Sequence, residues 1–269
     1  MPTTFTSFPV AYSNALDEVL VASTYASKYS VPGAEFLTAK QVSVPDLSFG
    51  ASPAPVAYNR FKSAEGDIKV DRKVYTLAHD DEKVFYIDAV DAINEAAVPI
   101  TKAISEYQRT ILAPEIDKDF FAVAKAKAAT KGTTALTAAN IKAEIRKART
   151  QFTQAGLHGG DLYMTSAALG LLEDATNRQW SNETSITDTV GSYNGFNVYE
   201  VADSILGADF TAISGGNRTM QYITKRAALY LFAPGSHTNG DGWLAQNRWV
   251  YGSIVPANKA AGVYTSKKA

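Results

Sequence analysis

The first sixty residues limit the possible fold most, because they lack the regular spacing of apolar residues that a compact domain needs. Prolines break any long helix or strand there, at Pro9, Pro32, Pro45, Pro53 and Pro55. Only residues 13–26 have the spacing of a short helix. Aromatic side chains are nonetheless frequent, at Phe5, Phe8, Tyr12, Tyr25, Tyr29 and Phe36. Because disordered segments are poor in aromatics, we expect an arm that becomes ordered against another subunit.

A β-rich stretch follows the arm. Residues 41–47 and 68–77 mix apolar and polar side chains as strands do, and a Gly-, Pro- and Ser-rich tip at about 49–67 separates them. The acidic triplet at 80–82 predicts a turn, and residues 83–87 predict a returning strand. A two-stranded ribbon by itself is marginally stable in water, so this ribbon needs another surface to lie on.

Apolar residues spaced by three and four predict a long helix, at Ile93, Ala96, Ala97, Ile100, Ile104, Tyr107 and Ile111. Asp88 and Asp91 precede it as candidate caps. Pro114 marks a kink or a second start, after which residues 116–124 continue the apolar stripe. We expect a long rod that is bent or broken near Pro114.

Helices and strands then alternate. After a linker at 131–134, Thr137 is expected to cap a helix that ends at Gly156. Residues 162–165 predict a buried strand, and Ser166 is expected to cap a short helix. The remaining segments predict strands, at about 196–201, 210–213, 220–223, 227–232, 249–255 and 261–265. A sheet with Trp249, Tyr251 and Ile254 should cover the stripe of the long helix, formed by Ile100, Ile104, Tyr107 and Ile111.

Composition excludes several classes of protein. The formal net charge of −1 argues against a protein whose main task is to grip nucleic acid. Cysteine is absent, which excludes disulfides, thiolate metal sites and cysteine nucleophiles. The longest apolar run, about 227–233, is far shorter than the ~20 residues of a membrane-spanning helix. The N-terminus has no pattern of a secretory signal.

The most site-like cluster is the loop at residues 235–242. His237 and Asp241 could be an acid–base pair, or a weak cation site with Asn239. The alternative is a loop between two strands, for which Gly, Asn, Asp and Ser are the usual residues. The common nucleophile, phosphate-binding, zinc-protease and dinucleotide motifs are all absent from the sequence.

Other candidate residues have simpler structural roles. His158 and Asp161 follow a helix end, and His79 lies beside Asp80 and Asp81 in the expected hairpin turn. Two pairs of carboxylates, Asp88 with Asp91 and Glu115 with Asp117, could each share a proton or a metal. We expect both pairs to cap helices instead. We therefore expect no enzyme activity, and no catalytic, cofactor-binding or metal-binding residue.

The order of these segments resembles the major capsid proteins of tailed bacteriophages, which have the Hong Kong 97-type fold. The residues that carry the resemblance are IDAVD at 87–91, PEID at 114–117, GFNV at 195–198 and the closing strands at 251–255 and 261–263. The likeness extends over about residues 16–264. No single motif is specific, and their collinear order supports the resemblance.

The resemblance implies an α+β fold with four parts. These are an N-arm at 1–38, an extended hairpin or E-loop at 39–87, a peripheral domain with a spine helix at 88–133 and 225–269, and an axial domain at 134–224. It implies a coat protein that assembles with copies of itself into hexamers and pentamers of an icosahedral shell. That shell would enclose double-stranded DNA in a virion assembled in the host cytoplasm.

The resemblance also implies partners. Residues 1–40 are too short and too uncharged for a built-in scaffold, so we expect a separate scaffolding protein, together with a portal and decoration proteins. The last glutamate is Glu200, so we expect no Lys–Asn cross-link assisted by a late carboxylate. Two alternatives stay open. One is an encapsulin-like compartment with protein cargo, and the other is a hydrolase that uses His237 and Asp241.

Overall fold

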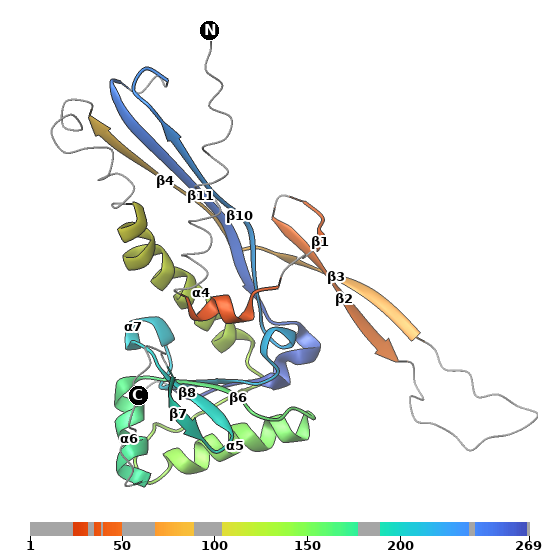
Figure 1. The fold of residues 1–269 in the computed structure, drawn as a ribbon. Coiled ribbons are helices and arrows are strands. Elements are labelled where there is room, and N and C mark those ends of the chain that lie inside the picture. Colours follow the sequence, from red (N-terminus) through yellow and green to blue (C-terminus); the bar gives the residue numbers. More distant parts are fainter. Residues whose placement is uncertain are drawn as a thin grey trace, which may run out of the picture.

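The computed structural model describes residues 24–31, 35–38, 40–49, 68–88, 104–176, 189–236 and 240–267. Within these residues the chain forms three β-sheets and several helices, which confirms the α+β prediction. Figure 1 shows a helix-covered sheet at one end of the molecule, a long sheet that rises from it beside α4, and a ribbon that projects to the side. No described helix is long and apolar enough to cross a membrane.

The largest sheet has six strands in the order β5-β12-β9-β6-β8-β7. The strands are β5 (Thr130–Lys131), β6 (Gly160–Met164), β7 (Thr189–Tyr193), β8 (Phe196–Glu200), β9 (Phe210–Ile213) and β12 (Val263–Thr265). Leu162 and Met164 pack into one apolar cluster with α5 (Ile141–Gln154) and α6 (Ser166–Thr176). Tyr163 points to the opposite face, where α4 (Ala113–Lys127) and η1 (Tyr25–Tyr29) lie. Both faces of this sheet are therefore covered.

Short elements connect these parts, namely α7 (Asp203–Leu206), η3 (Gly216–Arg218) and η4 (Ala257–Gly262). The predicted linker at 131–134 begins inside β5, which pairs in parallel with β12. The predicted helix caps, Thr137 and Ser166, are both wrong. Asn140 stands at the start of α5, and its side chain accepts a hydrogen bond from the Thr137 backbone N–H. Thr165 rather than Ser166 caps α6, because its hydroxyl accepts a hydrogen bond from the Ala168 N–H.

A second sheet has the order β10-β11-β4, with β10 (Gln221–Phe232), β11 (Gly242–Ile254) and β4 (His79–Asp88). The separate strands predicted at 220–223 and 227–232 are one strand with an irregularity between Thr224 and Arg226. Trp249 stacks on Tyr107, as predicted, and both Trp249 and Tyr251 share an apolar cluster with α4. Ile254 packs on the other face with Val250, because successive side chains of a strand alternate between faces. The prediction for Ile254 is therefore wrong.

The rod beside this sheet is continuous through the proline. Residues 104–107 are helical, a π-helical turn (η2) spans Gln108–Leu112, and α4 follows. The Ala113 N–H bonds to the Gln108 carbonyl, five residues back, just before Pro114, which has no N–H to offer. Ile104 is 1% exposed and packs on the sheet as predicted, but Ile111 is 50% exposed, contrary to prediction. The extra residue in the π turn rotates the stripe, so Leu112 is buried instead.

The third sheet is the ribbon, with β1 (Glu35–Phe36), β2 (Gln41–Phe49) and β3 (Ile68–Thr76) in that order. The predicted pairing is confirmed, with Gln41 opposite Thr76 and Phe49 opposite Ile68. The predicted turn at 80–82 is wrong, because these residues lie within β4. The predicted returning strand at 83–87 pairs with β11 and not with the ribbon. Charged residues suit this position because β4 is an edge strand.

Candidate functional site

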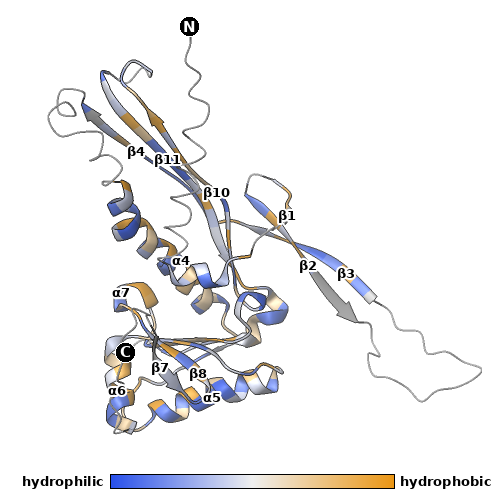
Figure 2. Ribbon diagram, viewed as in Figure 1, coloured by the Kyte–Doolittle hydropathy of each residue, from blue (hydrophilic) through white to orange (hydrophobic). Residues whose placement is uncertain are grey.

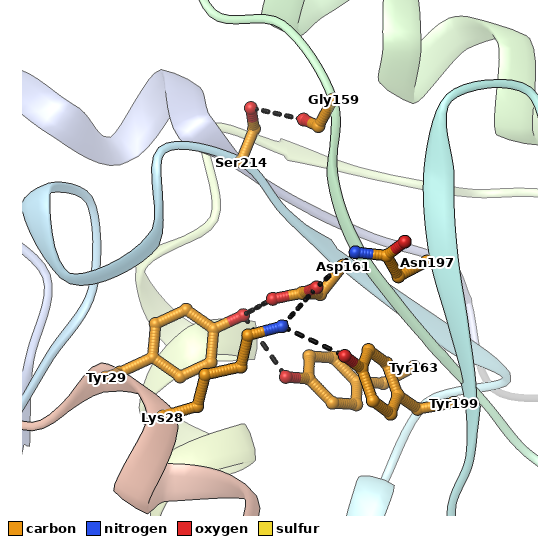
Figure 3. Close-up of polar contacts among 8 residues, drawn as sticks. All are labelled: Lys28, Tyr29, Gly159, Asp161, Tyr163, Asn197, Tyr199 and Ser214. Carbon is orange, nitrogen blue, oxygen red and sulfur yellow. Dashed lines mark hydrogen bonds and ion pairs between the residues drawn. The ribbon is translucent and has the colours of Figure 1, made fainter. Parts of the chain in front are cut away.

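The segment of residues 24–31 fastens the large sheet to α4, and Asp161 of β6 is the centre of the contact (Figure 3). The Tyr29 hydroxyl donates to Asp161 Oδ2 at 2.7 Å, and the Lys28 ammonium donates to Oδ1 at 2.6 Å. Asn197 Nδ2 lies 3.5 Å from the same carboxylate. The Asp161 cluster, as we call it, consists of Lys28, Tyr29, Asp161, Tyr163, Asn197 and Tyr199. Asp161 is only 5% exposed, so these donors satisfy a charge that burial alone would destabilise.

The protonation states in this cluster suit a structural role. Burial raises the pKa of Tyr29 well above its usual range, and the Tyr163 and Asp161 oxygens add to that effect. Burial also raises the pKa of Tyr163. Partial burial of Lys28 lowers its pKa, but hydrogen bonds to Asp161 and Tyr199 outweigh this and raise the pKa overall. The lysine therefore stays charged and the two phenols stay protonated, which leaves no activated nucleophile or base among these three groups.

Further contacts hold the same segment to its own subunit. The Ala26 N–H donates to Asp117 Oδ1 at 3.0 Å, and the Tyr25 hydroxyl donates to the Glu200 carbonyl at 2.9 Å. The Val31 N–H donates to the Tyr222 carbonyl at 3.2 Å, beside a parallel bridge between Ser30 and Tyr222. The prediction that this segment orders against another subunit is wrong for residues 24–31. Residues 1–23 and most of the predicted helix at 13–26 lie outside the described residues.

Asp117 shows why a local pattern misjudged its role. Asp117 and Glu115 were both expected to cap the helix from its first turn. Glu115 is exposed, and its Oε1 lies 3.6 Å from the Lys118 Nζ. Asp117 is buried and serves the backbone of η1, ninety-one positions away in the chain.

The base of the ribbon is joined firmly to the long sheet. Val42 and Leu77 are buried with Ile223, Val250 and Ile254 in one apolar cluster. Beside this cluster Asp80 pairs with Arg248 at 2.9 Å and with Lys40 at 3.3 Å, and the Arg248 hydrogen bonds hold the pKa of Asp80 below its usual range. Gly252 permits the close approach, because a Cβ there would lie 3.1 Å from the Leu77 Cα and the Ala78 nitrogen.

Beyond its base, strand β3 of the ribbon is exposed to solvent. Val70 and Val74 of β3 are 61% and 51% exposed, and their charged neighbours on β3 are exposed as well. Figure 2 shows β3 as mainly hydrophilic, with few apolar positions. Val84 and Tyr86 of β4 are also exposed large apolar residues. About half of each of these four side chains is exposed in the part of the subunit that the structure describes.

The structure describes only some of the predicted catalytic candidates. His237 and Asn239 lie outside the described residues, and Asp241 is exposed in the turn before β11. His158 is exposed, whereas Asp161 is buried in the cluster above. Of the paired carboxylates, Asp91 is outside the described residues and Asp88 ends β4. The described residues contain no group of three or more His, Asp or Glu side chains suited to a metal ion.

The sequence suggested that His79 lies in a solvated turn, and the structure shows that it does not. Its Nε2 lies 3.1 Å from Asp119 Oδ1 of α4, and its Nδ1 lies 3.4 Å from Asp81 Oδ2. The imidazole stacks on Tyr251 with a centroid distance of 4.7 Å. His79 therefore connects the start of β4 to α4.

Sequence reasoning missed the Asp161 cluster, although two signals for it were present. Tyr25 and Tyr29 stood out as aromatics in an otherwise irregular segment. Asp161 directly precedes the predicted buried strand at 162–165, where a carboxylate needs a partner. The partner itself is 133 positions away, which no local pattern encodes.

Solved structures with the same fold come from virus capsids and a virus-like particle. The capsid structure of the cyanophage P-SCSP1u matches with a TM-score of 0.67 at 14% identity, over 91% of this chain and 88% of that one. The mature capsid of bacteriophage PhiM1 matches with a TM-score of 0.66 at 15% identity, over 91% of this chain and 87% of that one. A virus-like particle from Pyrococcus furiosus matches with a TM-score of 0.60 at 8% identity, over 97% of this chain and 100% of that one.

These matches confirm, at the level of the fold, the resemblance to tailed-phage capsid proteins of the Hong Kong 97 type. At such low identity the matches define the fold and nothing finer. The sequence matches no family model and no curated protein.

Proposed function

We propose that this chain is the major capsid protein of a tailed bacteriophage, which assembles into an icosahedral shell around double-stranded DNA. The observation that carries the proposal is the β2–β3 ribbon, which is anchored at its base and exposed on β3 from Lys69 to Val74. Exposed apolar residues on an extended ribbon gain stability only when a second surface covers them. Copies of the same chain supply that surface in a shell.

The parts of the chain take the roles implied by the fold. We propose residues 1–38 as N-arm, 39–87 as E-loop, 88–133 with 225–269 as peripheral domain and 134–224 as axial domain. Two strand pairings favour moving these boundaries. Strand β4 pairs with β11 and not with the ribbon, which favours an E-loop that ends near Thr76 instead of residue 87. Strand β12 pairs with β9, which favours assigning residues 263–265 to the axial domain instead of the peripheral domain.

Shell assembly also implies binding partners and a cellular location. We propose contacts with further copies in hexamers and pentamers, a separate scaffolding protein, a portal and decoration proteins. The particle would assemble in the host cytoplasm and become the virion. No catalytic group or cofactor is needed for this role, since flat complementary surfaces and reaching elements are sufficient.

Electron microscopy and light scattering of the purified chain test the proposal. We expect closed particles or capsomer rings, with or without a scaffolding protein. A solution that contains only 28.9 kDa monomers at high concentration, under both conditions, contradicts it.

An encapsulin-like compartment is the second candidate, because the virus-like particle from Pyrococcus furiosus matches over its whole length. The contents of particles purified from cells distinguish the two. Nuclease-protected DNA supports the phage capsid, whereas a single co-purified protein without DNA supports the compartment.

A further inference from the structure

Helix α5 carries three cationic side chains along one flank. Lys142, Arg146 and Arg149 are spaced by four and three residues, so they are neighbours on the helix surface. Arg146 and Arg149 are exposed and Lys142 is partly exposed. Arg149 donates to the Asn194 side-chain oxygen, which is neutral. None of the three forms an ion pair with a carboxylate in the part of the chain that the structure describes.

The only acidic residue of α5 does not neutralise this flank. Glu144 is buried on another side of the helix, where the Tyr264 hydroxyl donates to it at 2.8 Å and Lys147 pairs with it at 2.5 Å. Two described cations of the spine are arranged differently, since Arg109 pairs with Glu106 and Lys118 with Glu115. The flank of Lys142, Arg146 and Arg149, here called the α5 stripe, is thus a local excess of positive charge on a nearly neutral chain.

We propose that the α5 stripe contacts the phosphate backbone of double-stranded DNA without reading its sequence. This inference rests on the proposed function and adds the surface that faces the enclosed DNA. Both faces of the six-stranded sheet are covered, and α5 covers the face opposite α4 and η1. Helix α5, which carries the stripe, therefore lies on the side of the six-stranded sheet away from α4 (Figure 1).

The chemistry of the stripe fits phosphate. Its three cations span about 10 Å of helix at 1.5 Å per residue. B-DNA carries one charge per ~1.7 Å of its axis, so several phosphates lie within that length. Guanidinium groups suit phosphate oxygens because their planar N–H donors can bind two at once. Three contacts on a chain of net charge −1 give weak, salt-sensitive binding that lets packaged DNA move.

The test measures binding of a short labelled duplex of mixed sequence to the full chain before assembly, over a series of salt concentrations. The variant Lys142→Gln/Arg146→Gln/Arg149→Gln removes the stripe. Arg109→Gln/Lys118→Gln/Lys127→Gln removes the same charge from exposed positions of the spine and is the matched control. Asn194→Ala controls for the bond lost with Arg149, and Arg146→Lys/Arg149→Lys keeps the charge.

The slope of log K against log salt decides the outcome. We expect the stripe variant to lower its magnitude by about 3, one unit for each phosphate contact. The spine control, Asn194→Ala and the lysine-for-arginine variant should each change it by less than about 1. Equal losses in the stripe variant and the spine control overturn the inference, because they show a response to net charge alone.

Particle formation separates this inference from the proposed function. If the stripe variant forms particles and binds DNA as tightly as the wild-type chain, the inference is overturned and the shell proposal stands. A folded stripe variant that no longer assembles shows that the stripe is a contact between subunits, which also overturns the inference. Failure of every variant and of the wild type to assemble overturns the shell proposal, while the salt slopes still decide whether the stripe binds DNA.

Discussion

The six-stranded sheet and the β2–β3 ribbon are built from similar strands but differ in what covers them. Leu162 and Met164 of the sheet are completely buried under α5 and α6, and Tyr163 is buried on the opposite face. Val70 and Val74 of the ribbon face water. Burial of an apolar side chain contributes roughly 1.5–3 kcal/mol, so the sheet stabilises the single subunit, whereas the exposed Val70 and Val74 of the ribbon contribute little to it. These two side chains can gain this stabilisation only when another surface covers them.

Shortening the ribbon should give the largest effect and tests this difference directly. Deletion of Ala54–Glu65, between β2 and β3, should abolish particle formation and leave the melting temperature of the subunit nearly unchanged. Electron microscopy and calorimetry measure the two properties. Normal assembly by the deletion variant would contradict the assigned role, and an unfolded subunit would place the segment in the core.

Truncation of a buried spine residue should act on the subunit itself. Ile104 packs against Leu229 and Ala245, so Ile104→Ala should lower the unfolding free energy by about 2–5 kcal/mol. Ile111→Ala, on the same rod but exposed, should change it by less than about 0.5 kcal/mol. Denaturant unfolding of both variants measures the contrast. Similar losses for the two would show that the π turn does not set the buried face.

Removal of one hydroxyl from the Asp161 cluster should have a moderate effect. Tyr29→Phe leaves the buried Asp161 with one donor fewer and should cost about 1–3 kcal/mol. Tyr199→Phe removes a contact of the more exposed Lys28 and should cost less. A loss for Tyr29→Phe no greater than that for Tyr199→Phe would mean that Lys28 and Asn197 satisfy the carboxylate without Tyr29.

The smallest effect should be the pH dependence of Glu144. Burial acts to raise the pKa of Glu144, but hydrogen bonds from Lys147 and Tyr264 outweigh it and lower the pKa. A carboxyl with a lowered folded pKa stabilises the fold above its unfolded pKa of about 4.3, and this stabilisation is lost as pH falls through the folded pKa. On acidification from pH 7, wild type should therefore lose more stability than Glu144→Gln. Glu115→Gln, at an exposed position, should behave like wild type.

Much of the fold follows from local patterns in the sequence. The three-and-four spacing at Ile141, Ile145, Ala148 and Phe152 predicts the buried face of α5, and all four side chains are buried. Gly156 ends that helix in the left-handed region, at φ +73°, as its position predicted. The pairing of residues 41–47 with 68–77 also follows from alternation and the composition of the tip.

The tertiary structure decided which partner each element takes. Residues 83–87 are equally acceptable as a strand beside the ribbon or beside β11, and only packing on the spine helix selects β11. Ile111 and Leu112 differ in burial because the π turn before Pro114 rotates the helix, which a period of 3.6 does not foresee. Lys28 and Tyr29 meet Asp161 across more than 130 positions. Periodicity determines which side of a segment avoids water, whereas the contacts that bury a charge depend on segments that only the folded chain brings together.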